Sequence, residues 1–273
     1  MRNGIFSGLV VCLSIVATTS FGIGSPETVL SRGPHHRVVE TIADAPSVDG
    51  GVIRHTNRFT ELGNGLSYLG ETGEWLASEE TIELLENGGA TARQGQHKVV
   101  FPPTSLGEID FMTSDGKRFV SRPVWLAYYD AESGESLLIA GIKESVGAVR
   151  GNQVVYADAF SGVKANLVFT YRIGSFEQDV VLLEDPPLPQ GFNEATTRLQ
   201  LWTEFTEYPA VAKEEYVVKG ESDAARRQAM ASPDLTDSIL RFGQMEFARG
   251  KAFMVDDNGA GRVGRNANEE LQV

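Results

Sequence analysis

Apolar and polar residues alternate along much of this chain with the period of two that is typical of β-strands. The clearest stretch contains two predicted strands, 163–172 and 176–184, separated by Gly174-Ser175. The second strand becomes apolar on both faces toward its end, which predicts a position inside a sheet rather than at its edge. The short glycine-containing connection predicts a hairpin. In the first strand the apolar face is formed by Leu167, Phe169 and Tyr171.

Similar strand-like runs recur at short spacing before and after this pair. They are predicted at residues 52–59, 66–69, 75–77, 81–85, 90–93, 98–101, 109–113, 118–129, 136–142, 153–156, 198–205, 239–242 and 252–255. Turn signals rich in glycine and asparagine, which tolerate a positive φ, separate many of these runs. They lie at 63–65, 71–73, 87–89, 114–116, 132–134 and 151–152. Many short strands with regular turns predict an all-β fold, an antiparallel β-sandwich. Pro123 inside the run 118–129 predicts an edge position or a bulge.

The first 24 residues have the layout of a cleavable signal peptide. Arg2 is followed by an apolar run at 9–16 and then by small residues, and cleavage is expected between Ser20 and Ser25. The apolar run is too short to span a bilayer. The alternative interpretation is an apolar first strand of the domain.

The mature chain is expected to have three parts. Residues 25–50, rich in proline and glycine around a short apolar patch at Val38-Val39, predict an extended lead-in. Residues 51–208 predict the β-sandwich domain. Residues 209–273 predict an extension with a short helix over Ser222–Ala231 and a β-hairpin. The chain ends without a closing element, so we expect it to continue into a longer protein.

Composition and charge narrow the functional classes. Apolar residues at 41% and charged residues at 22% are ordinary for a globular protein. Without the first 24 residues the chain has 23 basic and 37 acidic residues, a net charge of −14. Such a surface repels nucleic acid and anionic lipid, so we expect no nucleic-acid partner and no membrane insertion of the mature chain. Cys12 is the only cysteine and lies in the signal peptide, which leaves no disulfide or thiol nucleophile. The expected location is extracellular, at the cell surface or in the periplasm.

Four carboxylates lie in or beside predicted strands and are the candidate catalytic residues. Glycoside hydrolysis requires only two carboxyl groups that face each other across a cleft. A pair among the four could serve a glycoside hydrolase or lyase, although a solvated acidic face is the simpler interpretation. The candidates are Asp158, Glu177, Asp179 and Glu204.

Aromatic residues in the predicted strands offer a second kind of site. Trp75, Trp125 and Trp202 are candidates for binding a sugar face, and Tyr128, Tyr129 and Tyr156 lie in similar positions. The alternative is that these rings pack in the core or across strands. A glycan or a protein at the cell surface is therefore a possible partner.

Other patterns have simpler explanations. The histidines His35, His36, His55 and His97 lack the spacing of a transition-metal site, so no metal and no cofactor are expected. Gly259–Gly264 matches a dinucleotide-binding glycine pattern, but only nine residues follow it, which favours a loop. Asp130 with Glu132, and the run 256–258, are typical of turns rather than of a calcium loop.

The segments Tyr156–Gly162, Val163–Phe169 and Phe176–Leu182 resemble a recurrent β-rich segment of large exported bacterial proteins. These include wall-associated and Rhs-type repeat proteins, in whose amino-terminal regions the segment occurs. Asn166 stands where that segment usually has aspartate, and Ser161 where proline is common. The resemblance covers about 30 residues. It implies a secreted or cell-surface structural region and transfers no catalytic residue.

The leading interpretation is therefore an exported, non-enzymatic β-sandwich region with a structural or interaction role. The first alternative is a carbohydrate-binding module. The second is a glycoside hydrolase or lyase that uses paired carboxylates.

Overall fold

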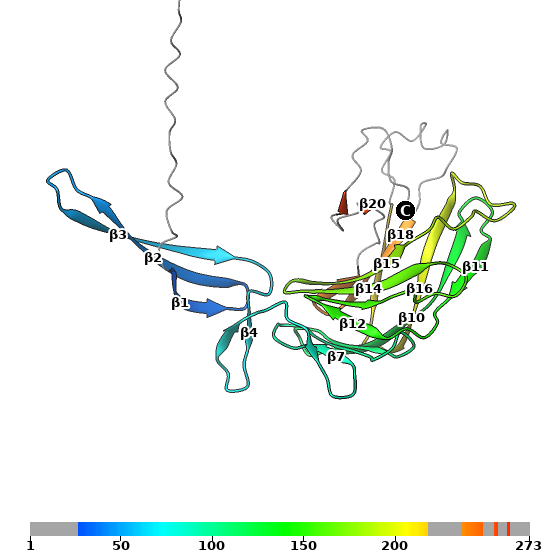
Figure 1. Cartoon of the computed structure of the whole chain (residues 1–273), viewed down its shortest axis with the longest axis horizontal. Coiled ribbons are helices and arrows are strands. Elements are labelled where there is room, and N and C mark those ends of the chain that lie inside the picture. The colour runs from blue at the N-terminus through cyan, green and yellow to red at the C-terminus, as the bar shows by residue number, and fades with distance from the viewer. Residues whose placement is uncertain (1–26, 218–235, 248–253, 256–260, 263–273) are drawn as a thin grey trace, which may run out of the picture. The chain divides into compact units, whose positions relative to one another are not determined.

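The structure, a computed structural model, describes residues 27–217, 236–247, 254–255 and 261–262. These residues form β-strands, turns and loops and contain no helix (Figure 1). The predicted signal peptide and the predicted helix over Ser222–Ala231 lie outside the described residues. The strands are β1 (Glu27–Gly33), β2 (His36–Pro46), β3 (Val52–Leu62), β4 (Ser67–Leu69), β5 (Trp75–Ala77), β6 (Glu83–Leu84), β7 (Ala90–Ala92), β8 (Lys98–Phe101), β9 (Ile109–Met112), β10 (Arg118–Asp130), β11 (Ser136–Gly141), β12 (Gly147–Arg150), β13 (Gln153–Tyr156), β14 (Ala165–Arg172), β15 (Ser175–Leu182), β16 (Thr197–Glu207), β17 (Ala212–Val217), β18 (Thr236–Phe242), β19 (Met245–Phe247), β20 (Met254–Val255) and β21 (Gly261–Arg262).

The chain divides into two compact units. Of the described residues, unit 1 contains 27–31 and 37–61, whereas unit 2 contains 32–36 and those from 62 onward. Unit 1 is built on the three-stranded sheet β1-β2-β3. The sequence predicted an extended lead-in over residues 25–50, but the structure forms β1 and β2 there. These strands carry polar side chains on both faces, so they lack the alternation that reveals a half-buried strand.

A long hairpin, β2–β3, makes up most of unit 1. The turn at 47–51 is closed by a hydrogen bond of 2.8 Å from the Ser47 amide to the Gly51 carbonyl. Three ion pairs then join the two strands along their length. They are Arg54–Asp44 at 3.0 Å, Arg58–Glu40 at 2.8 Å, and Arg37–Glu61.

Unit 2 is an antiparallel β-sandwich, as the sequence predicted. One layer is a seven-stranded sheet in the order β11-β10-β9-β8-β7-β6, with β16 paired to β10 over almost its whole length. The other layer is the four-stranded sheet β12-β13-β14-β15. Smaller sheets are formed by β4-β5, β17-β18-β19 and β20-β21.

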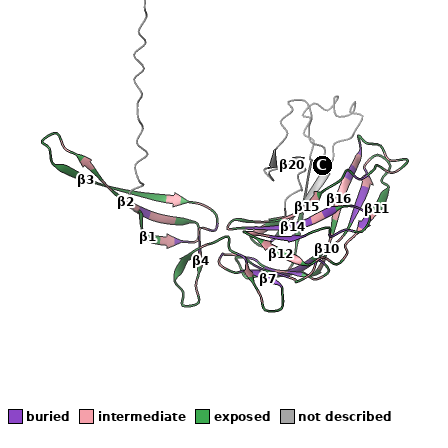
Figure 2. Cartoon of the chain, viewed as in Figure 1, coloured by how far each residue is buried: buried purple, intermediate pink, exposed green. Residues whose placement is uncertain are grey.

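Aromatic side chains from both layers fill the core between the sheets. Figure 2 shows buried residues on strands of both layers. Phe111 and Phe119 from the larger sheet stack with centroids 4.7 Å apart, and Phe169 and Phe176 from the smaller sheet stack at 5.7 Å. The predicted apolar face of β14, formed by Leu167, Phe169 and Tyr171, is fully buried in this core. Burial of rings of this size is a major part of the stability of a domain.

The structure corrects one prediction about β15. Its apolar residues predicted a place inside a sheet, yet β15 lies at the end of the four-stranded sheet. The inner face of β15 is covered by the other layer instead: Phe176 and Val180 pack against the core, and Gln178 donates a 2.9 Å hydrogen bond to Thr203 of β16. Contact between the layers therefore explains the apolar residues on the inner face of this strand.

Pro123 causes a bulge in β10, as expected. The register of β10 against β16 shifts between Pro123 and Trp125. On its other side β10 pairs with β9 before the bulge and with β11 after it. Proline, which has no amide hydrogen, thus lies between the two ladders where no partner strand needs a donor.

Candidate functional site

Two tryptophans meet on the outer face of the seven-stranded sheet. Trp125 of β10 and Trp202 of β16 are directly opposite each other in the ladder. Their ring centroids are 5.8 Å apart at an interplanar angle of 38°. Both remain open to solvent, with 37% of Trp125 and 46% of Trp202 exposed. The neighbouring residues Leu126 and Leu201 point inward and pack in the core, so the alternation of each strand fixes the rings outside.

The surroundings of this tryptophan pair combine open space with polar groups. Gly141 of β11 is opposite Trp125 on the other side and contributes no side chain. The indole Nε1 of Trp202 donates a 3.1 Å hydrogen bond to Gln200. On the other side of the Pro123 bulge, Arg122 and Glu204 are opposite each other in the same two strands and form an ion pair at 2.7 Å. Flat apolar rings bordered by hydrogen-bonding groups can stack on a planar ligand face and fix its orientation.

The remaining candidate aromatics have other environments. Trp75 is exposed but lies on the separate β4-β5 sheet, where it is opposite Leu69. Tyr156 and Tyr128 are buried, and their hydroxyls donate to the carbonyls of Pro102 at 2.7 Å and Pro186 at 2.8 Å. Burial raises the pKa of both tyrosines. The predicted group of aromatics thus separates into core rings and exposed rings.

The four candidate carboxylates are distributed over three parts of unit 2. Asp158 lies in the connection after β13 and pairs with Lys143 at 2.7 Å. Glu204 lies on the outer face of the seven-stranded sheet, next to the inward-facing Phe205. Glu177 lies on the outer face of the four-stranded sheet, next to the inward-facing Phe176, and pairs with Arg172 at 3.3 Å. The sandwich core therefore separates Glu204 from Glu177.

Glu177 and Asp179 are the two candidate carboxylates that the structure brings together. They share the outer face of β15, opposite Thr170 and Val168 of β14. Burial and the nearby charge of Glu177 raise the pKa of Asp179, while Arg172 acts in the opposite direction. A carboxyl group with a raised pKa beside a second carboxylate is the arrangement that acid catalysis uses. These two carboxylates, however, extend from the same face of one strand and do not face each other.

The histidines also lie in different surroundings. His97 packs against two core rings, with its ring centroid 5.4 Å from that of Phe111 and 4.7 Å from that of Tyr171. His35 accepts a 3.2 Å hydrogen bond from the Gly65 amide through Nδ1. His55 lies exposed on β3. Within the described ranges, no three histidine, cysteine or acidic residues are grouped so that they could hold a metal ion.

Asp130 is buried at the end of β10 and acts as a turn residue. Its carboxylate accepts hydrogen bonds from the Thr196 hydroxyl at 2.6 Å and the Glu132 amide at 3.0 Å. These donors, together with the Asn193 amide, hold the pKa of Asp130 below its usual range. Both carboxylate oxygens of Asp130 accept hydrogen bonds within the turn, so Asp130 stabilises the turn, as the sequence pattern indicated.

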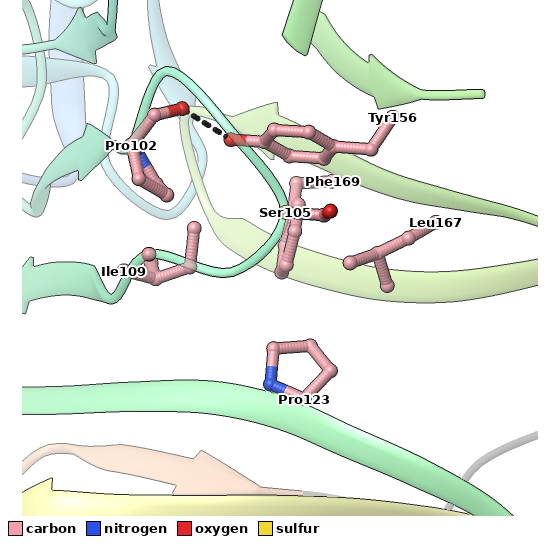
Figure 3. A pocket seen from close by; sticks show the side chains of 8 residues that line it. Pro102, Ser105, Ile109, Pro123, Tyr156, Leu167 and Phe169 are labelled. Atoms are coloured by element: carbon pink, nitrogen blue, oxygen red, sulfur yellow. Dashed lines mark hydrogen bonds between the residues drawn. The ribbon is translucent and has the colours of Figure 1, made fainter. Parts of the chain in front are cut away.

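A small apolar pocket is lined by residues of the β8–β9 connection and of strands β9, β10, β13 and β14 (Figure 3). Proline, isoleucine and aromatic side chains line it, and the hydrogen bond from Tyr156 to Pro102 crosses its rim. The pocket is too small to admit a water molecule. None of the four candidate carboxylates lines it, so it is not a site for them.

Sequence reasoning named both members of the tryptophan pair but could not pair them. Gln200 and Gly141, which shape the surroundings of the rings, were missed. Their positions depend on the register between β10, β11 and β16, for which a single sequence has no local signal.

Comparisons with family models, curated proteins and solved structures gave no match to this chain. Within the described ranges, no helix is long and apolar enough to cross a membrane.

Proposed function

We propose that this chain is an exported, non-enzymatic β-sandwich region of a secreted or surface-associated bacterial protein, with an interaction role. The observation that carries the proposal is the exposed pair Trp125–Trp202. Tryptophan is enriched at binding surfaces, and the inward-facing residues of the same strands already supply the core. The signal-peptide pattern, the acidic surface and the resemblance to exported bacterial proteins support the location.

The proposed location is tested by sequencing the amino terminus of the protein recovered from the medium or the cell envelope. We expect it to begin between positions 21 and 25, after the small residues that follow the apolar run. A retained Met1 on protein found in the cytoplasm would contradict export.

The non-enzymatic role is tested with the purified chain from residue 25 onward. It is incubated with β-glucans, chitin, peptidoglycan and pectin, and the released reducing ends and unsaturated products are measured. We expect no release above that of a variant with Asp158, Glu177, Asp179 and Glu204 all changed to alanine. Turnover that disappears in this variant would establish the hydrolase or lyase alternative.

Carbohydrate binding is the second candidate, because the tilted tryptophan pair offers two adjacent rings for sugar stacking. Cello-oligosaccharides and chito-oligosaccharides are titrated into the protein and the heat of binding is recorded. Trp125→Ala and Trp202→Ala are each expected to weaken binding about tenfold or more, the loss typical of a central aromatic contact. Trp75→Ala, which changes an exposed tryptophan outside the pair, is the matched control. If all three variants and the original chain bound sugar with equal affinity, the tryptophan pair would not be the sugar-binding site.

A further inference from the structure

Unit 1 has very little core of its own. Val39 is the only buried apolar side chain in its three strands, and every residue of β3 except Glu61 is exposed (Figure 2). A three-stranded sheet usually needs one hydrophobic face, packed against something, for independent stability. Unit 1 would therefore gain more stability from an added strand than a well-packed sheet would.

The strand β3 is well suited to accept a partner strand. It lies at the end of the β1-β2-β3 order, so it is paired on one side only in the described part of the chain. It is eleven residues long, about twice the usual strand length. Natural edge strands are commonly protected by proline, a bulge or free charged side chains. The sequence of β3 contains no proline, lysine or glycine, and its charged residues Arg54, Arg58 and Glu61 are already in ion pairs with β2. Its backbone groups are available for another ladder.

We propose that β3 pairs with β3 of a second copy of this chain, antiparallel and centred on Asn57. A two-fold axis perpendicular to the sheet places each residue opposite one on the same face, and full overlap of residues 52–62 places Asn57 opposite its own copy. The result is a continuous six-stranded sheet across the two copies. This proposal does not rest on the proposed function, because the tryptophan pair belongs to unit 2.

The side chains of β3 favour this register. At one end Val52 is opposite Leu62 of the second copy, and both are exposed apolar residues in the single chain. Nearer the centre His55 is opposite Phe59, and the asparagines can hydrogen-bond to each other across the axis. Aromatic and apolar pairs directly opposite each other stabilise antiparallel ladders.

The neighbouring registers place like charges opposite each other. Moving the axis to Thr56 places Arg54 opposite Arg58 of the second copy, and moving it to Arg58 places that residue opposite itself. Like charges directly opposite each other destabilise a sheet. With the axis at Asn57, Arg54 is opposite Thr60 and Arg58 is opposite Thr56, so no like charges are paired. The ion pairs of Arg54 with Asp44 and Arg58 with Glu40 also remain available.

The proposal is tested first by sedimentation of the full mature chain over a range of concentrations. We expect a concentration-dependent dimer. Asn57→Asp and Asn57→Lys each place two like charges across the axis and should raise the dimer dissociation constant about tenfold. An equal mixture of the two variants should restore the dimer, because opposite charges then meet. Ser47→Asp, in the turn outside the paired strands, should leave the dimer unchanged.

The mixing experiment separates loss of pairing from loss of folding, because a misfolded variant would not recover when mixed. A monomer at every concentration would overturn the proposal, as would a dimer that neither Asn57 variant weakens. Failure of the glycan titration would have no effect on this result.

The register is tested by cross-linking. The chain has no cysteine after Cys12, so Asn57→Cys introduces a single thiol into the mature protein. Directly opposite residues in an antiparallel pair have Cα atoms about 4.5–5.5 Å apart, within the range of a disulfide. We expect Asn57→Cys to form covalent dimers faster than Thr56→Cys, Arg58→Cys or Ser47→Cys. Faster cross-linking at position 56 or 58 would contradict the proposed axis.

Discussion

His97 shows how the environment of one residue controls its charge. Its ring lies between Phe111 and Tyr171, and its Nε2 atom is buried without a hydrogen-bond partner. Burial lowers the pKa of His97 below 6.5, although backbone groups of Ser175 and Arg172 oppose the shift. The unfolded chain therefore binds a proton at a higher pH than the native protein does. The free energy of unfolding is expected to fall as the pH decreases below about 6.5.

Replacement of this histidine is expected to remove that pH dependence. Between about pH 7.5 and pH 5.5 the original chain should lose unfolding free energy through His97, by up to about 1 kcal/mol. In His97→Phe this loss should disappear, and in the exposed variant His55→Gln it should remain. Urea unfolding at several pH values provides the measurement. An equal pH dependence in His97→Phe and the original chain would assign the effect to other groups.

Asp179 is expected to have the opposite effect on the pH dependence of stability, because its pKa is raised rather than lowered. Burial and the charge of Glu177 raise its pKa above 3.8, so the ionised native form is less favourable than the ionised unfolded form. Its contribution to stability is complete below the unfolded pKa and is lost as the pH rises through the native pKa. Asp179→Asn should therefore increase the unfolding free energy at about pH 7 by up to about 1 kcal/mol. Denaturant titrations should show no increase in unfolding free energy at about pH 3, where the Asp179 carboxyl is protonated in both the native and the unfolded state.

At the scale of elements, tight turns determine where strands begin and end. Gly65 and Gly73 both have a positive φ, of 71° and 88°. A Cβ atom at Gly65 would lie 2.0 Å from the Ile173 carbonyl oxygen, whereas a Cβ at Gly73 would meet nothing within 4 Å. A side chain at Gly65 is therefore disfavoured both by the positive φ and by contact with Ile173. A side chain at Gly73 is disfavoured by the positive φ alone.

This difference predicts unequal effects of alanine at the two turns. Gly73→Ala should lower the free energy of unfolding by about 1 kcal/mol, the usual cost of a side chain in this conformation. Gly65→Ala should cost at least about 2–3 kcal/mol, because the turn must also move away from the β14–β15 connection. Thermal unfolding of the two variants compares them directly. Equal costs would mean that the Gly65 turn moves freely.

Many elements of unit 2 could be predicted from local patterns. The bounds of β5, β8 and β13 agree with those predicted, because turn residues delimit short runs of apolar residues. The strand β12 was missed, since Gly147–Arg150 carries little alternation. In unit 1, β2 was missed because both of its faces meet solvent. Sequence patterns report burial, so strands without a buried face are difficult to detect.

At the scale of the whole molecule, burial is uneven between the two units. The core strands β8, β13 and β14 contain fully buried rings, whereas β1 and most of β2 are exposed or half-buried. Regions with few buried apolar contacts open at a lower free energy than the global core does. The two units should therefore differ in local stability.

Hydrogen exchange is expected to reveal this difference. Amides of β8, β13 and β14 should exchange only through global unfolding, and those of β1 and β2 through local opening several orders of magnitude faster. Mass spectrometry of peptic fragments measures both groups in one experiment. Uniform protection across β1, β2 and β14 would contradict the expected order.

The candidate site also depends on the whole molecule. Trp125 and Trp202 come from strands far apart in the sequence, and their contact requires the β10–β16 register and the bulge after Pro123. Local alternation can predict that each ring lies outside the core. It cannot predict that the rings meet, because a shift of one residue would move one of them to the other face.

The pairing of β10 with β16 also affects the time course of folding. The long middle strand of the larger sheet is complete at residue 130, but the strand that covers its open side begins only at residue 197. Closing so distant a contact is entropically slow, and β-rich proteins with such contacts typically fold in about milliseconds to seconds. A chain emerging from the ribosome at about 5–20 residues per second would wait several seconds between these two strands. During that interval the side of β10 that β16 later covers has no partner strand, and an unpaired strand edge of this kind can pair with another chain.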